Sequence, residues 1–149
     1  MKKLFFILAT GFVLFSMNPL QAQIRKIPAE VTESFKEKYA DSKNVEWKDK
    51  VTFFQANFEM KGDKYEARFN SKGQWQEREK AIEKDHLPSD VKDGFDKSKF
   101  SDWEVRSVAW VENKDAAIQY RVLVKKNSVE KKYLFFNEQG KLLRESITI

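Results

Sequence analysis

The feature that most constrains the fold is that the sequence writes one pattern twice. Residues 27–35 read IPAEVTESF and residues 87–95 read LPSDVKDGF, with an aliphatic residue, a proline, an acid, a valine and a phenylalanine in common. Further along, FNSKGQW at 69–75 matches FNEQGKL at 136–142. Two matching anchors in the same order indicate a tandem duplication, in which the chain builds one structural unit twice.

Each copy is expected to open with a helix and to continue as strands. Pro28 and Pro88 suit the first helical position, where a missing N–H costs nothing. Behind each proline, apolar residues recur about every four positions and predict one buried stripe per helix: Ile27, Val31, Phe35 and Tyr39, then Leu87, Val91, Phe95 and Phe100. The period then falls to two, as in Phe54, Ala56 and Phe58, which predicts antiparallel strands with one buried face.

The repeated NSKG and NEQG segments predict the same tight turn in each copy. Asparagine favours the start of a type I turn, and a glycine at its end can adopt a positive φ. Gly73 and Gly140 stand at that position. Each turn is therefore expected to close the last hairpin of its copy, which is a structural role.

Together these patterns predict an α+β fold. We expect a tandem repeat of a helix followed by three to four antiparallel strands, with the helices packed on one face of the sheet and the other face open. The predicted divisions are a signal peptide at 1–22, a first helix-plus-sheet repeat at 23–84 and a second at 85–149.

The first 22 residues have the layout of a secretory signal peptide. Lys2 and Lys3 form a basic head, the apolar run 4–15 follows, and a small residue, Ala22, precedes the expected cut. The run is shorter than the roughly 20 apolar residues that span a bilayer, so no stable membrane insertion is expected after cleavage. The chain has no cysteine, which excludes a lipid anchor at the cut and any disulfide. We therefore expect a periplasmic or secreted protein.

The charge pattern disfavours nucleic acid as a partner. The full chain carries a net charge of +5, and removal of Lys2 and Lys3 leaves 26 basic against 23 acidic residues, a net charge of +3. Charges of both signs alternate along the chain, whereas a nucleic-acid binder usually gathers its basic residues on one face.

The residues that usually carry chemistry are sparse. His86 is the one histidine and stands between the copies, with no second histidine or cysteine to join it at a metal. Nucleophile motifs and glycine-rich phosphate loops are missing, and the aspartates are scattered over expected turns. The sequence therefore predicts no catalytic residue, no bound metal and no cofactor, and the protein is not expected to be an enzyme.

The reverse face of the sheet offers a candidate binding surface. In the second copy, strict alternation predicts an apolar reverse face made of Val108, Trp110, Leu123, Tyr133 and Phe135. In the first copy the same face is mainly polar, with Gln55, Asn57, Glu59, Glu66 and Arg68. The apolar residues are either core, covered by a loop, a helix or a second copy, or an exposed aromatic patch of the kind that marks a protein-binding surface.

Several of these segments resemble a known family. The segments IPAEV, NVEW, KYEARFNSKGQW, LPSDVKDGF and LFFNEQGKLL, behind a cysteine-free signal, resemble the PepSY-like, β-lactamase-inhibitor-protein-like family of exported bacterial proteins. The resemblance covers residues 24–149. It implies a helix-plus-antiparallel-sheet repeat and a binding module without catalysis, because the inhibitor protein grips its enzyme with a concave sheet face and PepSY domains are similar to inhibitory propeptides.

Two functional hypotheses follow. In the first, the protein docks an unidentified protein partner on its sheet and inhibits or modulates a secreted or periplasmic enzyme such as a peptidase. In the second, it is a small-ligand-binding or envelope-stress protein with a pocket between helices and sheet. Self-association is a third possibility. The resemblance carries no contact residue and names no target.

Overall fold

The structure is a computed structural model that describes residues 26–148. The predicted signal peptide at 1–22 lies outside the described residues.

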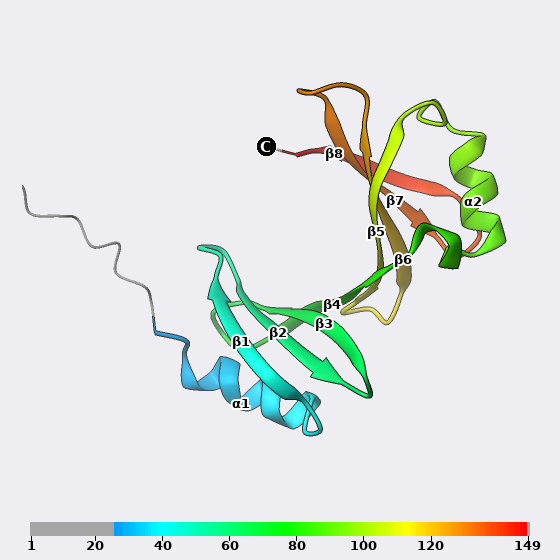
Figure 1. The fold of residues 1–149 in the computed structure, drawn as a ribbon. Helices are drawn as coiled ribbons and strands as arrows, with labels where there is room; N and C mark the ends of the chain where they lie inside the picture. Colours follow the sequence, from blue (N-terminus) through cyan, green and yellow to red (C-terminus); the bar gives the residue numbers. More distant parts are fainter. Residues whose placement is uncertain (1–25, 149) are drawn as a thin grey trace, which may run out of the picture.

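Eight strands form one antiparallel sheet, and their order in space is their order in the chain (Figure 1). The strands are β1 Lys43–Asp49, β2 Phe54–Met60, β3 Asp63–Phe69, β4 Trp75–Ile82, β5 Glu104–Asn113, β6 Ile118–Lys125, β7 Lys131–Asn137 and β8 Leu142–Ile147. Helix α1, Ala29–Lys38, precedes β1. The 3-10 helix η1, Lys84–His86, and helix α2, Ser89–Asp96, lie between β4 and β5.

The predicted fold class is wrong. Instead of an α+β tandem repeat of helix and three to four strands, with a layer of helices packed on the sheet, the described chain is mostly sheet. Its eight strands form one continuous sheet, and two short helices of 10 and 8 residues each lie over part of one face. The continuity comes from β4 and β5, which pair from Glu77↔Asn113 to Ile82↔Val108. This pairing satisfies backbone groups that two separate sheets would leave at their edges. The predicted division at residue 84 falls inside η1, and the division of the chain into these two parts remains a prediction.

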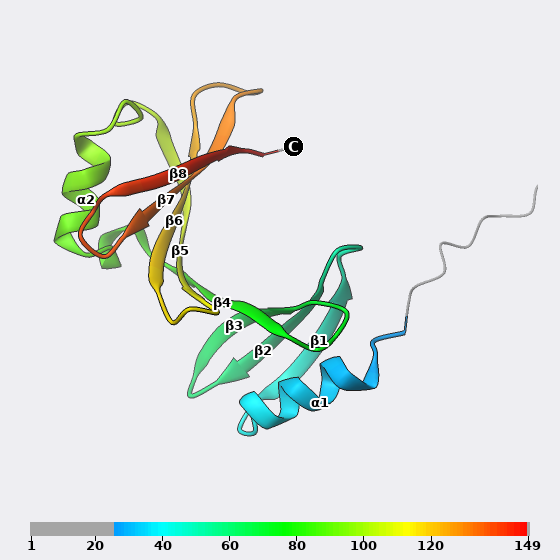
Figure 2. The same cartoon turned by 180° about the vertical axis from the view of Figure 1, so that it is seen from behind.

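The sheet is strongly curved and has one face free of helices. Figures 1 and 2 show the bend near β4 and β5, with α1 and α2 both outside the curve and the β1–β2 turn and the end of β8 both on the inner side. The strand register agrees, because Arg78 pairs with Ala67 of the α1 core while Ile82, four positions further along β4 and so on the same face, pairs with Val108 of the α2 core. We call the helix-covered side the convex face and the other side the concave face.

Two apolar clusters, one under each helix, hold the convex face together. The predicted stripes are confirmed as core, since Val31 and Val91 are fully buried and Phe35 and Phe95 are 3% and 6% exposed. Phe69 and Phe136, both fully buried, meet these stripes from the strands. The two prolines precede the helices by one residue, because the first helical residues are Ala29 and Ser89.

The two predicted turns are confirmed in detail. Gly73 has φ of 76° and Gly140 has φ of 75°. The Asn70 side-chain oxygen accepts hydrogen bonds from the backbone N–H groups of Lys72 and Gln74, both at 3.0 Å. The Asn137 oxygen accepts one from Lys141 at 2.8 Å. In each turn the asparagine side chain therefore fixes the backbone, and the glycine at the end of the turn adopts the positive φ.

A third turn of this kind carries alanine where the other two carry glycine. The Asn113 side-chain oxygen accepts hydrogen bonds from Asp115 and Ala117 N–H, and Ala116 has φ of 56°. An L-residue in this left-handed region costs about 1–2 kcal/mol, while glycine loses about 0.5–1 kcal/mol of extra entropy on folding. We expect Ala116→Gly to raise the free energy of unfolding by about 0.5–1 kcal/mol in urea denaturation. Ala117→Gly, at ordinary φ, should lower it slightly, and a loss in both variants would contradict the prediction.

Candidate functional site

Polar side chains of three neighbouring strands gather on the concave face. Cross-strand partners share a face of the sheet, and Gln55 pairs with Arg68, which pairs in turn with Glu77. The next rank along the strands, Glu66 with Glu79, lies on the same face. This confirms the polar reverse face predicted for the first copy.

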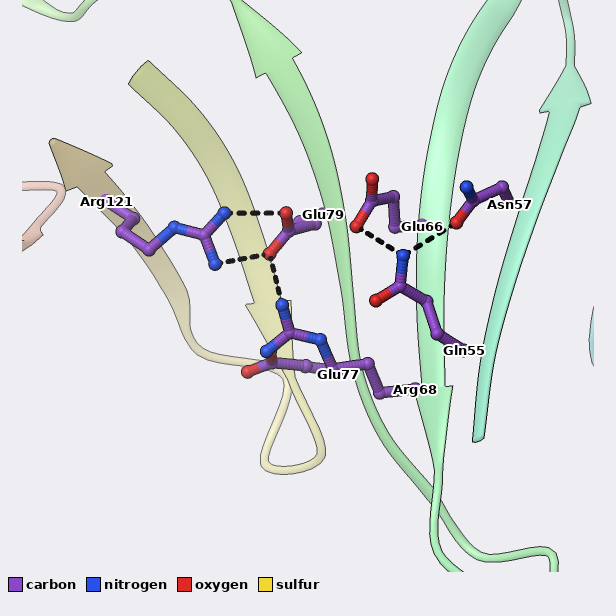
Figure 3. Close-up of polar contacts among 7 residues, drawn as sticks. All are labelled: Gln55, Asn57, Glu66, Arg68, Glu77, Glu79 and Arg121. Atoms are coloured by element: carbon purple, nitrogen blue, oxygen red, sulfur yellow. Dashed lines mark hydrogen bonds and ion pairs between the residues drawn. The ribbon is translucent and has the colours of Figure 1, made fainter. Parts of the chain in front are cut away.

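One contact on this face joins β4 to β6 through two short hydrogen bonds. Glu79 on β4 and Arg121 on β6 form a two-pronged ion pair, in which Arg121 Nη1 donates to Glu79 Oε2 and Nη2 donates to Oε1, both at 2.6 Å (Figure 3). The Glu79 and Arg121 side chains are 9% and 17% exposed. Such bidentate, poorly solvated pairs restrain both side chains.

A second arginine extends this contact into a network. Arg68 Nη2 donates to Glu79 Oε2 at 3.3 Å, and Arg68 Nη1 donates to Glu77 (Figure 3). Beside it, Gln55 Nε2 donates to the side-chain oxygens of Asn57 at 2.7 Å and Glu66 at 2.8 Å. The network is therefore an arranged surface.

Aromatic rings continue the concave face beyond the network. The register places Tyr133 and Phe135 of β7 on the same face as Arg121, because Phe135 pairs with Arg121. The Arg121 guanidinium lies 5.0 Å from the Tyr133 ring centroid, and the Arg144 guanidinium lies 3.3 Å from that of Phe135. Each ring is therefore covered by a cation.

The network and the rings line one hollow of about 570 Å³ on the concave face. Its lining runs from β1 to β8: Lys48, Lys50, Gln55, Glu66, Arg68, Glu77, Glu79, Val111, Arg121, Tyr133, Phe135 and Arg144. A second hollow of about 420 Å³ shares Glu66, Glu79 and Arg121 with the first. The concave face therefore offers a long, charged depression with aromatic rings at one end.

The five residues of the predicted binding face do not lie together. Leu123, Tyr133 and Phe135 are on the concave face. Val108 is 4% exposed and packs in the core under α2, and Trp110 lies on that same convex side. Whether any of them binds a partner stays a prediction.

A β-bulge explains the misplaced pair. Val105 pairs with Val124 and Ser107 with Leu123, so Arg106 is an extra residue in β5. One extra residue reverses the side to which every later side chain points. Strict alternation along this segment therefore assigned Val108 and Trp110 to the wrong face.

Trp110 belongs instead to a cluster around Arg78 on the convex face. The Arg78 guanidinium lies 5.3 Å from the Trp110 ring, 5.1 Å from the Tyr65 ring and 5.9 Å from the Tyr39 ring. Arg78 Nη2 also donates to Glu112 at 2.7 Å. The cluster covers the junction of β4 and β5, which is a structural role.

This cluster makes the free energy of unfolding depend on pH in the alkaline range. Burial raises the pKa of the Tyr39 phenol to about 12 from 10.0, and the charge of Arg78 offsets part of that rise. Between these values the unfolded chain has lost the proton that the folded chain keeps, so the free energy of unfolding falls as the pH rises. We expect Tyr39→Phe to abolish about 2 kcal/mol of this fall between pH 9.5 and 11.5, measured by urea denaturation. Equal losses in parent and variant would contradict this.

Side chains that bind metals do not gather in the part of the chain that the structure describes. Within residues 26–148, no three His, Cys, Asp or Glu side chains converge as a metal site. His86 is exposed in η1. In the same part of the chain, no helix is long and apolar enough to cross a membrane.

A separate hollow of about 440 Å³ lies between α1 and β1. Phe35, Tyr39, Val45 and Trp47 supply most of its apolar lining. It lies where the small-ligand hypothesis expects a pocket, between a helix and the sheet.

Comparison with solved structures supports the fold. A DUF2874 family protein from Bacteroides ovatus is 28% identical with a TM-score of 0.72, covering 83% of this chain and 89% of that one. A protein from Bacteroides eggerthii described as "putative periplasmic" is 25% identical with a TM-score of 0.70, covering 83% and 90%. A BLIP-like protein from Bacteroides fragilis, 24% identical, shares the fold with a TM-score of 0.69, covering 83% and 88%. No curated protein matches the chain.

A family model gives the assignment. The model described as "Putative beta-lactamase-inhibitor-like, PepSY-like" matches residues 50–144. This stretch is more than half of the chain and contains every residue that lines the larger concave hollow except Lys48. The chain therefore belongs to the beta-lactamase-inhibitor-like, PepSY-like family.

Proposed function

We propose that this protein is a non-catalytic, exported binding module that docks a protein partner on its concave face. The observation that carries the proposal is the concave face itself, which is free of helices and contains a hollow of about 570 Å³. Charged side chains fixed by hydrogen bonds and two aromatic rings line this hollow. Protein interfaces are enriched in arginine and aromatic side chains of this kind.

The comparisons support the class of function. The family is described as beta-lactamase-inhibitor-like and PepSY-like, so we propose that the partner is an exported enzyme, such as a peptidase, that this protein inhibits or modulates. The protein from Bacteroides eggerthii is described as periplasmic, which supports a periplasmic or secreted location together with the signal peptide predicted at 1–22.

Site-specific photo-crosslinking in producing cells tests the docking face. A photoreactive phenylalanine analogue at Tyr133 would sit in the hollow, and the same analogue at Lys97, which is 74% exposed on the convex side just after α2, is the matched control. We expect a discrete protein adduct at position 133 that is missing at position 97. An adduct at 97 alone, or no adduct at 133, would refute docking on the concave face.

A further inference from the structure

We propose that the concave hollow receives an acidic loop of the protein partner, whose Asp or Glu carboxylates bind between Arg144 on one side and Lys48 and Lys50 on the other. This inference rests on the proposed docking function and names the chemistry of the partner. It follows from which charged side chains of the hollow already pair with one another and which do not.

The hollow carries more positive charge than its own carboxylates neutralise. Five cationic and three anionic side chains line it. Glu79 is neutralised by Arg121, and Glu77 by Arg68. The third acid, Glu66, accepts a hydrogen bond from the neutral amide of Gln55.

Three cations therefore remain for a partner. Lys48 reaches an acid only at 4.0 Å, in Glu46, whose side chain is 68% exposed. Among the described residues, Lys50 and Arg144 form no ion pair with a carboxylate. Positive charge that no carboxylate of the protein neutralises favours an incoming anion.

Arg144 is held in an orientation in which its guanidinium can bind a carboxylate. Its guanidinium stacks on the Phe135 ring at 3.3 Å, and Phe135 is only 7% exposed beneath it. A stacked guanidinium keeps the N–H groups at its edge free, and these form a fork that matches the two oxygens of a carboxylate. Stacking also lowers the entropy that the side chain loses on binding.

The three cations come from opposite ends of the sheet. Lys48 lies in β1 and Lys50 follows it, whereas Arg144 lies in β8, yet all three line one hollow. The curvature seen in Figure 1 brings these ends to the same side. A loop that enters the hollow would thus meet positive charge from both ends.

The floor of the hollow favours isolated carboxylates over a dense polyanion. Glu66, Glu77 and Glu79 line it together with the cations. A chain of phosphates would bring its charges against these acids, and like charges in contact are costly. An acidic loop can place one or two carboxylates near the three free cations and turn apolar side chains toward Tyr133.

Selection from a loop library tests the inference. The probe is a library of random eight-residue loops displayed on a rigid immunoglobulin-like scaffold and selected on the immobilised mature chain. Loops that lose binding to a Leu123→Ala/Tyr133→Ala variant are counted as concave-face binders. We expect Asp and Glu to be enriched in these loops over the starting library.

Affinity measurements on the selected loops separate local charge from net charge. We expect Lys50→Gln/Arg144→Gln to weaken binding by about 30-fold, and a rise from 50 to 300 mM salt to weaken it by about 10-fold. The control Lys36→Gln/Lys97→Gln makes the same charge change on the convex side and should have little effect. Equal weakening in both variants would overturn the inference, because net charge would then explain the binding.

The remaining outcomes distinguish the two proposals. Concave-face binders without acidic enrichment would overturn the acidic-loop inference and leave docking on the concave face intact. A selection that yields no concave-face binder would overturn both proposals. Circular dichroism of each variant shows whether it is folded, and the glutamine substitutions at exposed Lys50 and Arg144 keep side-chain size while removing charge.

Discussion

Replacing Gly140 by alanine is expected to lower the free energy of unfolding by about 3–5 kcal/mol, because two costs add at this position. Gly140 has φ of 75°, which an L-residue adopts at a penalty. A Cβ atom there would also overlap the carbonyl oxygen of Asp90 in the first turn of α2. The atoms that it would meet belong to the backbone of Asp90, which cannot rotate away as a side chain can. Urea denaturation followed by tryptophan fluorescence measures the loss.

Gly62 provides a matched control for the conformational part of this cost. It has φ of 85°, and a Cβ atom there would meet nothing within 4 Å. Gly62→Ala should therefore lose only about 1–2 kcal/mol, through the backbone alone. If the two variants lost the same stability, the close approach of the β7–β8 turn to α2 would not matter energetically.

Removing one side of the buried ion pair on the concave face has the second large expected effect. Glu79→Gln should lower the free energy of unfolding by about 2–4 kcal/mol, since it leaves the Arg121 guanidinium poorly solvated without its counter-charge. The loss should be only weakly reduced by salt, because the side chains are 9% and 17% exposed.

An exposed ion pair provides the comparison for the same interaction in contact with water. Asp93 and Lys97 form an ion pair 2.5 Å long, with side chains 61% and 74% exposed. Asp93→Asn should cost less than about 1 kcal/mol. The paired variant Glu79→Met/Arg121→Met should recover much of the loss seen in Glu79→Gln, because it removes both charges. A Glu79→Gln loss no larger than that of Asp93→Asn would contradict this account.

Local patterns predicted local structure well. Val31 and Phe35, which their spacing places on one stripe of the helix, lie together in the core under α1. The NSKG and NEQG segments form turns that end at a glycine with positive φ. These features depend on residues within about seven positions of each other. The fold class depends instead on β4 and β5, whose pairing joins Glu77 to Asn113 across 36 positions. No repeat or periodicity states which strand edges meet, so the single sheet could not be predicted in this way.

The candidate site was only half predictable for a similar reason. Alternation placed Gln55, Glu66 and Arg68 correctly on a polar face, because β2 and β3 pair without interruption. In β5 the bulge at Arg106 reverses the alternation, and nothing in the local sequence marks it. The ion pair of Glu79 with Arg121 joins residues 42 positions apart and requires the register of three strands.

The order of the strands has a consequence for how the chain folds. Every described strand pairs with its neighbour in the chain, and six of the seven connections between them are five residues or fewer. Chains whose contacts are close in sequence fold faster than those with distant contacts, since short loops close at low entropic cost. The sheet can therefore grow hairpin by hairpin from either end. The joining of β4 to β5 spans residues 83–103 and is the step expected to limit the rate.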